Sequence, residues 1–147
     1  MVGYYQGDAT YPRSRPAIIA HVCNNKGGWG RGFVLSISKR WRGPEQFFRA
    51  SAKRAELGDI QVSRVEETVW VANMIAQNGY QSKDNPIPLD YRALRSCLQQ
   101  VATLARQRGA SVHMPRIGCG LAGGSWETVE KILQDVFSNI EVYVYSL

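Results

Sequence analysis

The chain has 147 residues, of which 44% are hydrophobic and 20% are charged, and this predicts one globular domain over residues 1–147. The 18 Lys and Arg against 12 Asp and Glu give a net charge of +6, so the surface should attract anions. Because no stretch approaches the roughly 18 to 20 apolar residues of a membrane span and the first residues lack a signal peptide's apolar core, we expect a soluble, cytoplasmic monomer with no membrane partner.

The elements of the first half follow from where apolar residues recur. The run AIIAHVC is apolar at nearly every position, which is typical of a strand buried on both faces. After the loop NNKGGWGRG the apolar residues recur at helical spacing, and Pro44 then suits the first turn of a new helix. We predict a strand over 17–23, helices over 33–41 and 44–54, and a hairpin with strands over 60–65 and 68–75.

The second half continues this alternation. The segment QNGYQSKDNPIP is a predicted loop because Asn, Gly and Pro disrupt regular structure. Gly109 is a predicted helix C-cap, and Ser125 is a predicted N-cap for a helix whose apolar face runs from Val129 to Phe137. The other predicted elements are a helix over 89–108 and strands over 111–117 and 140–145. Strands that alternate with helices indicate a three-layer α/β/α sandwich around a mixed, mostly parallel central sheet.

The distribution of charges and cysteines limits the chemistry that the chain offers. The three cysteines include no C-x-x-C pair, so we expect reduced thiols and no disulfide, metal or cofactor. Between Arg31 and Arg54 the only acidic residue is Glu45. The basic residues there are Arg31, Lys39, Arg40, Arg42, Arg49, Lys53 and Arg54. We interpret them as a solvated helix face rather than a nucleic-acid surface, because they lack the interleaved aromatics of single-strand binders.

Two glycine-rich loops stand where ligands bind in folds of this kind. The loops from Asn24 to Gly32 and from Ile117 to Ser125 each follow a predicted buried strand and lead into a helix. Glycine lets backbone N–H groups converge on one point, and the helix that follows adds its positive dipole end. Tight turns explain either loop alone equally well, but the pair favours a phosphate or pyrophosphate ligand. The sequence has no P-loop for nucleotide hydrolysis, and no dinucleotide fingerprint follows the strand at 17–23.

Several of these motifs together resemble one family. GDAT, AHVCNN, GGWGRG, VANMI and above all PRIGCGLAGGSW are similar to the corresponding segments of macrodomains, the modules that bind ADP-ribose. The likeness runs from Gly7 to the terminal VYVYSL, and it is greatest to the hydrolases of ADP-ribosyl-glutamate and ADP-ribosyl-nucleobases, including their bacterial members. The resemblance implies a macrodomain-like sandwich whose ligand is ADP-ribose or an ADP-ribosylated protein.

The resemblance also implies roles for individual residues. Asp8 and Ala9 stand where macrodomains hold the adenine amino group, although a turn or a cap explains Asp8 nearly as well. Asn24 and Asn25 stand where the family contacts the distal ribose. The remaining predicted contacts are Tyr145 and Leu147 beside adenine, and Gly28, Trp29, Gly30, Arg31, Gly118, Cys119, Gly120, Leu121 and Ala122 around the diphosphate and distal ribose. An aromatic residue at 145 is also explained as part of the core.

Two positions depart from the hydrolase pattern. Gln77 replaces the lysine that forms a covalent intermediate in this branch, and Ala122 replaces its catalytic aspartate. Because Gln77 has no amine and the Ala122 side chain exchanges no proton, a lysine route is disfavoured. We interpret the other ionisable candidates as surface or core residues, namely Lys83, Asp84, Asp90, His21 and His113.

The resemblance still leaves a route to hydrolysis. Some macrodomains hydrolyse ADP-ribose esters or ADP-ribose-1″-phosphate without such groups, by holding a water against a phosphate. We therefore expect Asn25 and Gln77 to position water or ribose hydroxyls in a hydrolase of ester-linked ADP-ribose. The alternatives are a non-catalytic ADP-ribose reader, an ADP-ribose-1″-phosphate phosphatase, and a protein that processes ADP-ribosylated nucleic acid.

Overall fold

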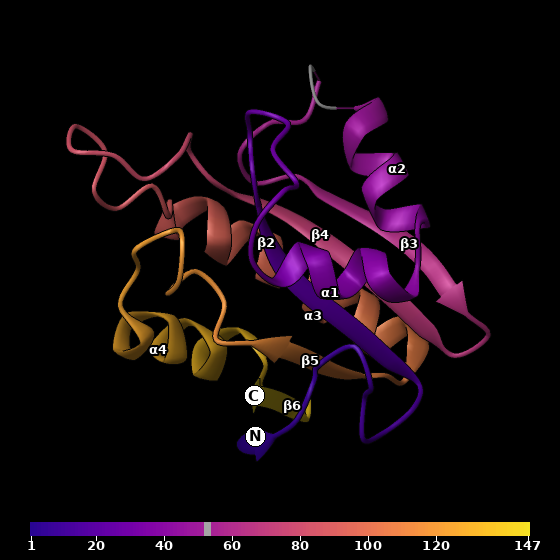
Figure 1. Ribbon diagram of the computed structural model, residues 1–147. Coiled ribbons are helices and arrows are strands. Elements are labelled where there is room, and N and C mark those ends of the chain that lie inside the picture. Colours follow the sequence, from indigo (N-terminus) through magenta and orange to yellow (C-terminus); the bar gives the residue numbers. More distant parts are fainter. Residues whose placement is uncertain (52–53) are drawn as a thin grey trace.

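The fold is a six-stranded sheet with helices packed on both faces (Figure 1). The computed structural model describes residues 1–51 and 54–147. The strands are β1 (Val2–Gln6), β2 (Ala17–Asn24), β3 (Ile60–Glu66), β4 (Val69–Gln77), β5 (Ser111–Pro115) and β6 (Val142–Ser146). The helices are α1 (Phe33–Arg40), α2 (Gly43–Ala50), α3 (Tyr91–Arg108) and α4 (Trp126–Val136). The predicted α/β/α sandwich is confirmed.

The sheet has the strand order β1-β6-β5-β2-β4-β3. All neighbouring strands run parallel except β3, which forms the predicted antiparallel hairpin with β4. The expectation of a mixed, mostly parallel sheet is therefore correct. Because β2, β4 and β5 are parallel, their carboxyl ends at Asn24, Gln77 and Pro115 meet at the same edge of the sheet.

Two hydrophobic clusters hold the layers together, one on each face of the sheet. On β2, Ile18 and Ala20 pack in the cluster that includes α3 and α4, whereas Ile19 and Cys23 pack in the cluster that includes α1 and α2. This alternation explains why the β2 run is apolar at nearly every position. Figure 1 shows α1 and α2 together on one face, with α3 and α4 on the other. No helix within the described ranges has the length and apolar character to cross a bilayer.

Several predicted boundaries shift for local reasons. The helix predicted over 44–54 ends at Ala50, and Ser51 follows with its hydroxyl donating to the Phe47 carbonyl at 2.7 Å. Residues 52–53 of that prediction, including Lys53, lie outside the described residues. Helix α3 begins at Tyr91 rather than residue 89, because the Asp90 carboxylate caps it by accepting the Ala93 N–H at 2.9 Å.

The two predicted caps stand at their predicted positions, but Ser125 makes no capping hydrogen bond with its side chain. Gly109 ends α3 in the left-handed conformation with φ of 61°, as predicted. Ser125 occupies the N-cap position of α4, but its side chain makes no capping hydrogen bond, and its backbone N–H instead donates to the Tyr91 hydroxyl at 2.8 Å. Strand β6 begins at Val142 rather than residue 140, because Asn139 adopts a positive φ of 63°.

Candidate functional site

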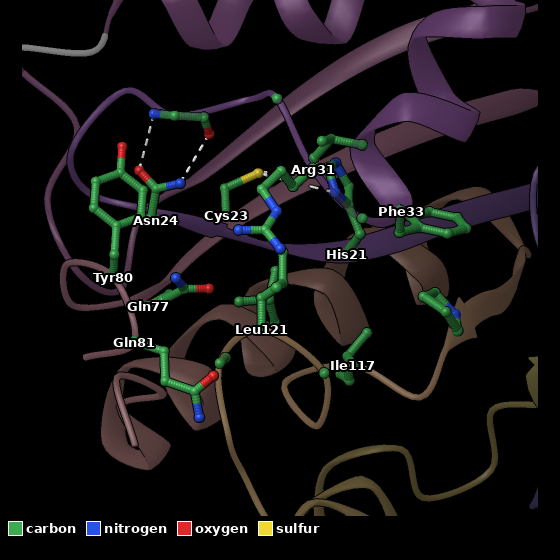
Figure 2. A pocket seen from close by; sticks show the side chains of 18 of the residues that line it. His21, Cys23, Asn24, Arg31, Phe33, Gln77, Tyr80, Gln81, Ile117 and Leu121 are labelled. Atoms are coloured by element: carbon green, nitrogen blue, oxygen red, sulfur yellow. Dashed lines mark hydrogen bonds between the residues drawn. The ribbon is translucent and has the colours of Figure 1, made fainter. Parts of the chain in front are cut away.

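A pocket of about 630 Å³ opens at the carboxyl edge of β2, β4 and β5. Its lining comes from the ends of these strands, from the loops after β2 and β4, and from the loop between β5 and α4. Figure 2 shows labelled side chains from β2, β4 and the loops after β2, β4 and β5 around it. A second hollow, of about 430 Å³, is lined only by residues 64–67 at the β3–β4 turn. The first pocket is the better candidate because polar groups from several elements converge on it.

The Asn24 side chain organises the loop after β2. Its Oδ1 accepts the N–H groups of Lys26 at 2.9 Å and Gly28 at 3.1 Å, and its Nδ2 donates to the Gly28 carbonyl at 2.8 Å. Gly28 packs closely against Tyr80, since an added Cβ would lie 2.4 Å from the Tyr80 hydroxyl and would displace that exposed side chain. Asn24 lines the pocket, but its amide acts as a brace that fixes the loop backbone.

The same loop divides its residues between the pocket and the core. Gly28, Gly30 and Arg31 line the pocket. Trp29 does not, and its ring is 3% exposed and packs against Phe48 with 5.3 Å between ring centroids. The Trp29 side chain is therefore a core element and not part of the described pocket lining, and the ligand contact expected for this residue stays a prediction.

The loop from Ile117 to Ser125 presents backbone to the pocket. Gly120, Leu121 and Ala122 line it, whereas Gly118 and Cys119 do not. No acceptor among the described residues pairs with the backbone N–H groups of Gly120, Leu121 and Ala122. Burial raises the pKa of the Cys119 thiol, opposed in part by Arg116, so Cys119 is a packed loop residue.

The two candidate catalytic amides differ in position. Gln77 lines the pocket, and its Nε2 donates to the Gly79 carbonyl at 2.9 Å. Asn25 lies outside the lining, and its side chain joins two loops by accepting the Gly79 N–H at 2.9 Å and donating to Asn78 Oδ1 at 3.1 Å. Both ends of the Asn25 amide are therefore bonded to the loop after β4, and the role expected for Asn25 at the ligand stays a prediction.

The four residues predicted around adenine also lie outside the pocket lining. Asp8 Oδ1 accepts both the backbone N–H and the hydroxyl of Thr10 at 2.8 Å, which is the turn that the sequence left open as an alternative. Ala9 is buried, and Leu147 is 97% exposed. The Tyr145 hydroxyl accepts the Arg13 N–H at 3.0 Å, which makes this ring part of the core.

The ionisable groups at the pocket are unsuited to proton transfer near neutral pH. His21 is 1% exposed, and burial lowers its pKa to about 4, although the hydrogen bond to Asn73 acts in the opposite direction. Burial also raises the pKa of the Cys23 thiol. No Asp, Glu or Lys among the described residues lines the pocket. Gln77 and Ala122 both do, so the two departures from the hydrolase pattern fall inside the site.

The remaining ionisable candidates are structural or distant. Lys83 and Asp84 are exposed and do not line the pocket, and Asp90 caps α3. Sequence reasoning missed Tyr80, Gln81, Phe33 and Arg116 among the lining residues. An aromatic residue in the polar loop directly after Gln77 was the available signal for Tyr80.

Comparison with known proteins places this geometry in a family. A family model described as "Macro domain" matches residues 20–133. A solved macrodomain protein from Streptomyces coelicolor is 44% identical, with a TM-score of 0.87 over 100% of this chain and 99% of that chain.

Two curated relatives add to this comparison. The ADP-ribose 1″-phosphate phosphatase of Candida albicans is 22% identical over 99% of both chains. The Mus musculus chromodomain-helicase-DNA-binding protein 1-like is 27% identical over 98% of this chain, which spans only 17% of that protein's length. Since the family model covers most of its residues, the chain belongs to the macrodomain family.

Proposed function

We propose that this macrodomain binds ADP-ribose in the pocket and hydrolyses esters that join ADP-ribose to acidic side chains, with water as the nucleophile. The proposal rests on one observation: Gly120, Leu121 and Ala122 line the pocket, and their backbone N–H groups have no acceptor among the described residues. Such groups bind anions when they stand before a helix N-terminus, and α4 begins a few residues later, at Trp126. The names of the relatives support ADP-ribose as the ligand that carries this anion.

The second glycine-rich loop supports a ligand with more than one anchored group. Gly30 and Gly120 are on opposite loops, and an added Cβ at either position would meet no atom within 4 Å. Both residues line the pocket, so neither loop places a side chain at these positions. We assign the loop from Ile117 to Ser125 to the diphosphate, and the loop after β2 to the distal ribose.

The proposed reaction needs no carboxylate or amine of the protein to exchange a proton. The water oxygen forms a bond to C1″ of the distal ribose, the bond from C1″ to the ester oxygen breaks, and the carboxylate leaves with that electron pair. The proton released by the water passes to solvent. Gln77 is the residue we assign to orienting the water, because its side chain lines the pocket at the end of β4.

A non-catalytic reader of ADP-ribosylated proteins is the second candidate. Its support is that Gln77 and Ala122 leave the described pocket lining without a carboxylate or an amine. A reader would bind ADP-ribose and leave the attached ester intact.

Release of ADP-ribose from a glutamate-linked peptide separates the two candidates. The hydrolase proposal predicts release well above the buffer-only rate, with no change for Lys83→Ala because Lys83 lies outside the pocket lining. Binding of ADP-ribose with release at the buffer-only rate would select the reader.

A further inference from the structure

The described pocket lining has no carboxyl group and no amine with which to protonate a leaving group. Ala122 occupies the position of the expected acid, Gln77 exchanges no proton, and His21 is buried and hydrogen-bonded to Asn73 at 2.6 Å. A group that leaves without a proton must be a stable anion in water. Carboxylates and phosphates meet this requirement, whereas the alkoxide of a serine and the neutral nitrogen of an arginine require proton transfer.

Arg31 supplies a positive charge at the pocket. It lines the pocket, is exposed to solvent, and has no ion pair or side-chain hydrogen bond among the described residues. Figure 2 shows its side chain extending into the pocket. Two other arginines of the same chain segment are paired, since Arg40 contacts Glu66 and Arg49 contacts Glu45.

Arg116 also lines the pocket, but its guanidinium is held elsewhere. It lies 5.5 Å from the ring centroid of Tyr4 and 5.4 Å from that of Trp126. These cation–π contacts direct the charge toward the two aromatic rings. Arg31 has no such contact among the described residues, so its charge is available to a ligand.

The depth of the lining residues indicates which part of the substrate meets Arg31. Gln77 is 9% exposed and forms the deep side, whereas Arg31, Tyr80 and Gln81 are exposed at the mouth. A sugar held inside the pocket must join its protein through the mouth. The bond from C1″ to the attached acid therefore lies on the side of the pocket where Arg31 stands.

We propose that Arg31 binds the acidic group attached to C1″ and makes the pocket selective for acyl- and phosphate-linked ADP-ribose over serine- and arginine-linked ADP-ribose. This inference rests on the proposed function and deepens it. A guanidinium binds a carboxylate or a phosphate through two parallel hydrogen bonds. As the bond from C1″ to the leaving oxygen breaks, the electron pair moves onto the acid, and Arg31 stabilises that growing negative charge. The same positive charge repels the guanidinium of an arginine-linked substrate.

The experiment compares Arg31→Gln and Arg31→Lys with the wild type. A matched control is Lys39→Gln, which also removes one positive charge but lies on α1 outside the pocket lining. Turnover is measured on glutamate-linked, serine-linked and arginine-linked peptides and on ADP-ribose-1″-phosphate, and ADP-ribose affinity is measured by calorimetry. Comparing turnover of the glutamate-linked peptide with turnover of ADP-ribose-1″-phosphate shows whether the pocket prefers a carboxylate or a phosphate as the attached acid.

For Arg31→Gln we expect kcat/KM on the glutamate peptide or ADP-ribose-1″-phosphate to fall about 10- to 100-fold, the usual effect of losing a charge-assisted hydrogen bond. The kcat/KM of Arg31→Lys should lie between those of Arg31→Gln and the wild type, because a lysine keeps the positive charge but cannot form two parallel hydrogen bonds. The Kd of Arg31→Gln for ADP-ribose should stay within about threefold of the wild-type value. The kcat/KM of Lys39→Gln should do the same. If Arg31→Gln lost ADP-ribose affinity by the same factor as kcat/KM, Arg31 would be assigned to the diphosphate and the inference would be overturned. The inference would also be overturned if the wild type cleaved the serine-linked peptide as fast as the glutamate-linked peptide.

A wild type that binds ADP-ribose without turnover would contradict the hydrolase proposal but leave Arg31 testable. In that case ADP-ribose-1″-phosphate should bind at least about 10-fold more tightly than ADP-ribose, and Arg31→Gln should remove the difference. Equal affinities of the wild type for the two ligands would overturn the inference by itself.

Discussion

At the scale of single residues, Gln77 is the side chain on which the proposed chemistry depends most. Its Nε2 is fixed by the Gly79 carbonyl, and no donor among the described residues pairs with its Oε1. We expect Gln77→Ala to lower kcat on a glutamate-linked substrate about 10- to 100-fold, because the water loses its orienting group. The Kd for ADP-ribose should change by less than about threefold, since the diphosphate keeps its backbone donors.

The control for this prediction is Gln46→Ala, which removes an exposed glutamine on α2. Single-turnover kinetics and calorimetry on both variants separate the chemical step from binding. Full activity of Gln77→Ala would show that water is oriented by another group.

The two histidines predict how stability depends on pH. Both are buried, and burial lowers the pKa of each to about 4. Burial keeps each ring neutral, and the hydrogen bonds fix its orientation. His21 Nε2 donates to Asn73 Oδ1, and the Tyr145 hydroxyl, which accepts the Arg13 N–H, donates to His113 Nδ1. Between pH 6.5 and 4 only the unfolded chain takes up protons on its histidines, so stability is complete above pH 6.5 and falls as the pH drops to 4.

Denaturant unfolding at several pH values measures this effect. Between pH 8 and pH 5 we expect a loss of roughly 2 kcal/mol for each histidine. The pKa values of Glu45 and Glu66 are lowered by Arg49 and Arg15, respectively. These carboxylates therefore change the stability only below the range from pH 8 to pH 5. Stability that stays level from pH 8 to pH 5 would mean that the histidines are protonated in the folded protein.

At the scale of elements, Gly120 and Gly123 show that one loop has two kinds of glycine. An added Cβ at Gly120 meets no atom within 4 Å, whereas at Gly123 it would lie 2.6 Å from the Pro86 carbonyl oxygen at a φ of 70°. Gly120→Glu should therefore fold normally and lose ADP-ribose binding, because its carboxylate occupies the anion site.

Thermal unfolding and calorimetry test this pair of expectations. Gly120→Gln is the matched control, since it has nearly the same size without the charge and should retain more affinity. Gly123→Ala should instead lower stability by about 1 to 3 kcal/mol, because its backbone conformation is strained for any residue with a Cβ. Tight ADP-ribose binding by Gly120→Glu would place the anion elsewhere.

Some elements were predictable from the sequence because local patterns determine them. The apolar run of β2, the β3–β4 hairpin and the Gly109 cap depend on neighbours in the chain, and all three are present. The directions of Trp29 and Asn25 were not predictable. Trp29 turns to the core to reach Phe48, and Asn25 bonds to a loop more than fifty residues later in the sequence.

At the scale of the whole molecule, the parallel sheet collects the site from distant parts of the chain. Strand ends at Asn24, Gln77 and Pro115 share one edge, and this could be expected once the sheet was predicted to be mostly parallel. The contribution of Tyr80 could not be expected from the sequence, because an irregular loop has no periodicity that indicates where its side chains point. The net charge of +6 is likewise a property of the whole chain, and a nucleic-acid partner stays a hypothesis.

A calorimetric titration with ADP-ribose measures whether the pocket binds this ligand. We expect one ADP-ribose to bind per chain with a micromolar dissociation constant, and the binding heat to be lost in a Gly120→Glu variant that folds as the wild type does. Absence of binding heat from the folded wild type at millimolar ADP-ribose, or equal affinity of wild type and Gly120→Glu, would contradict this expectation.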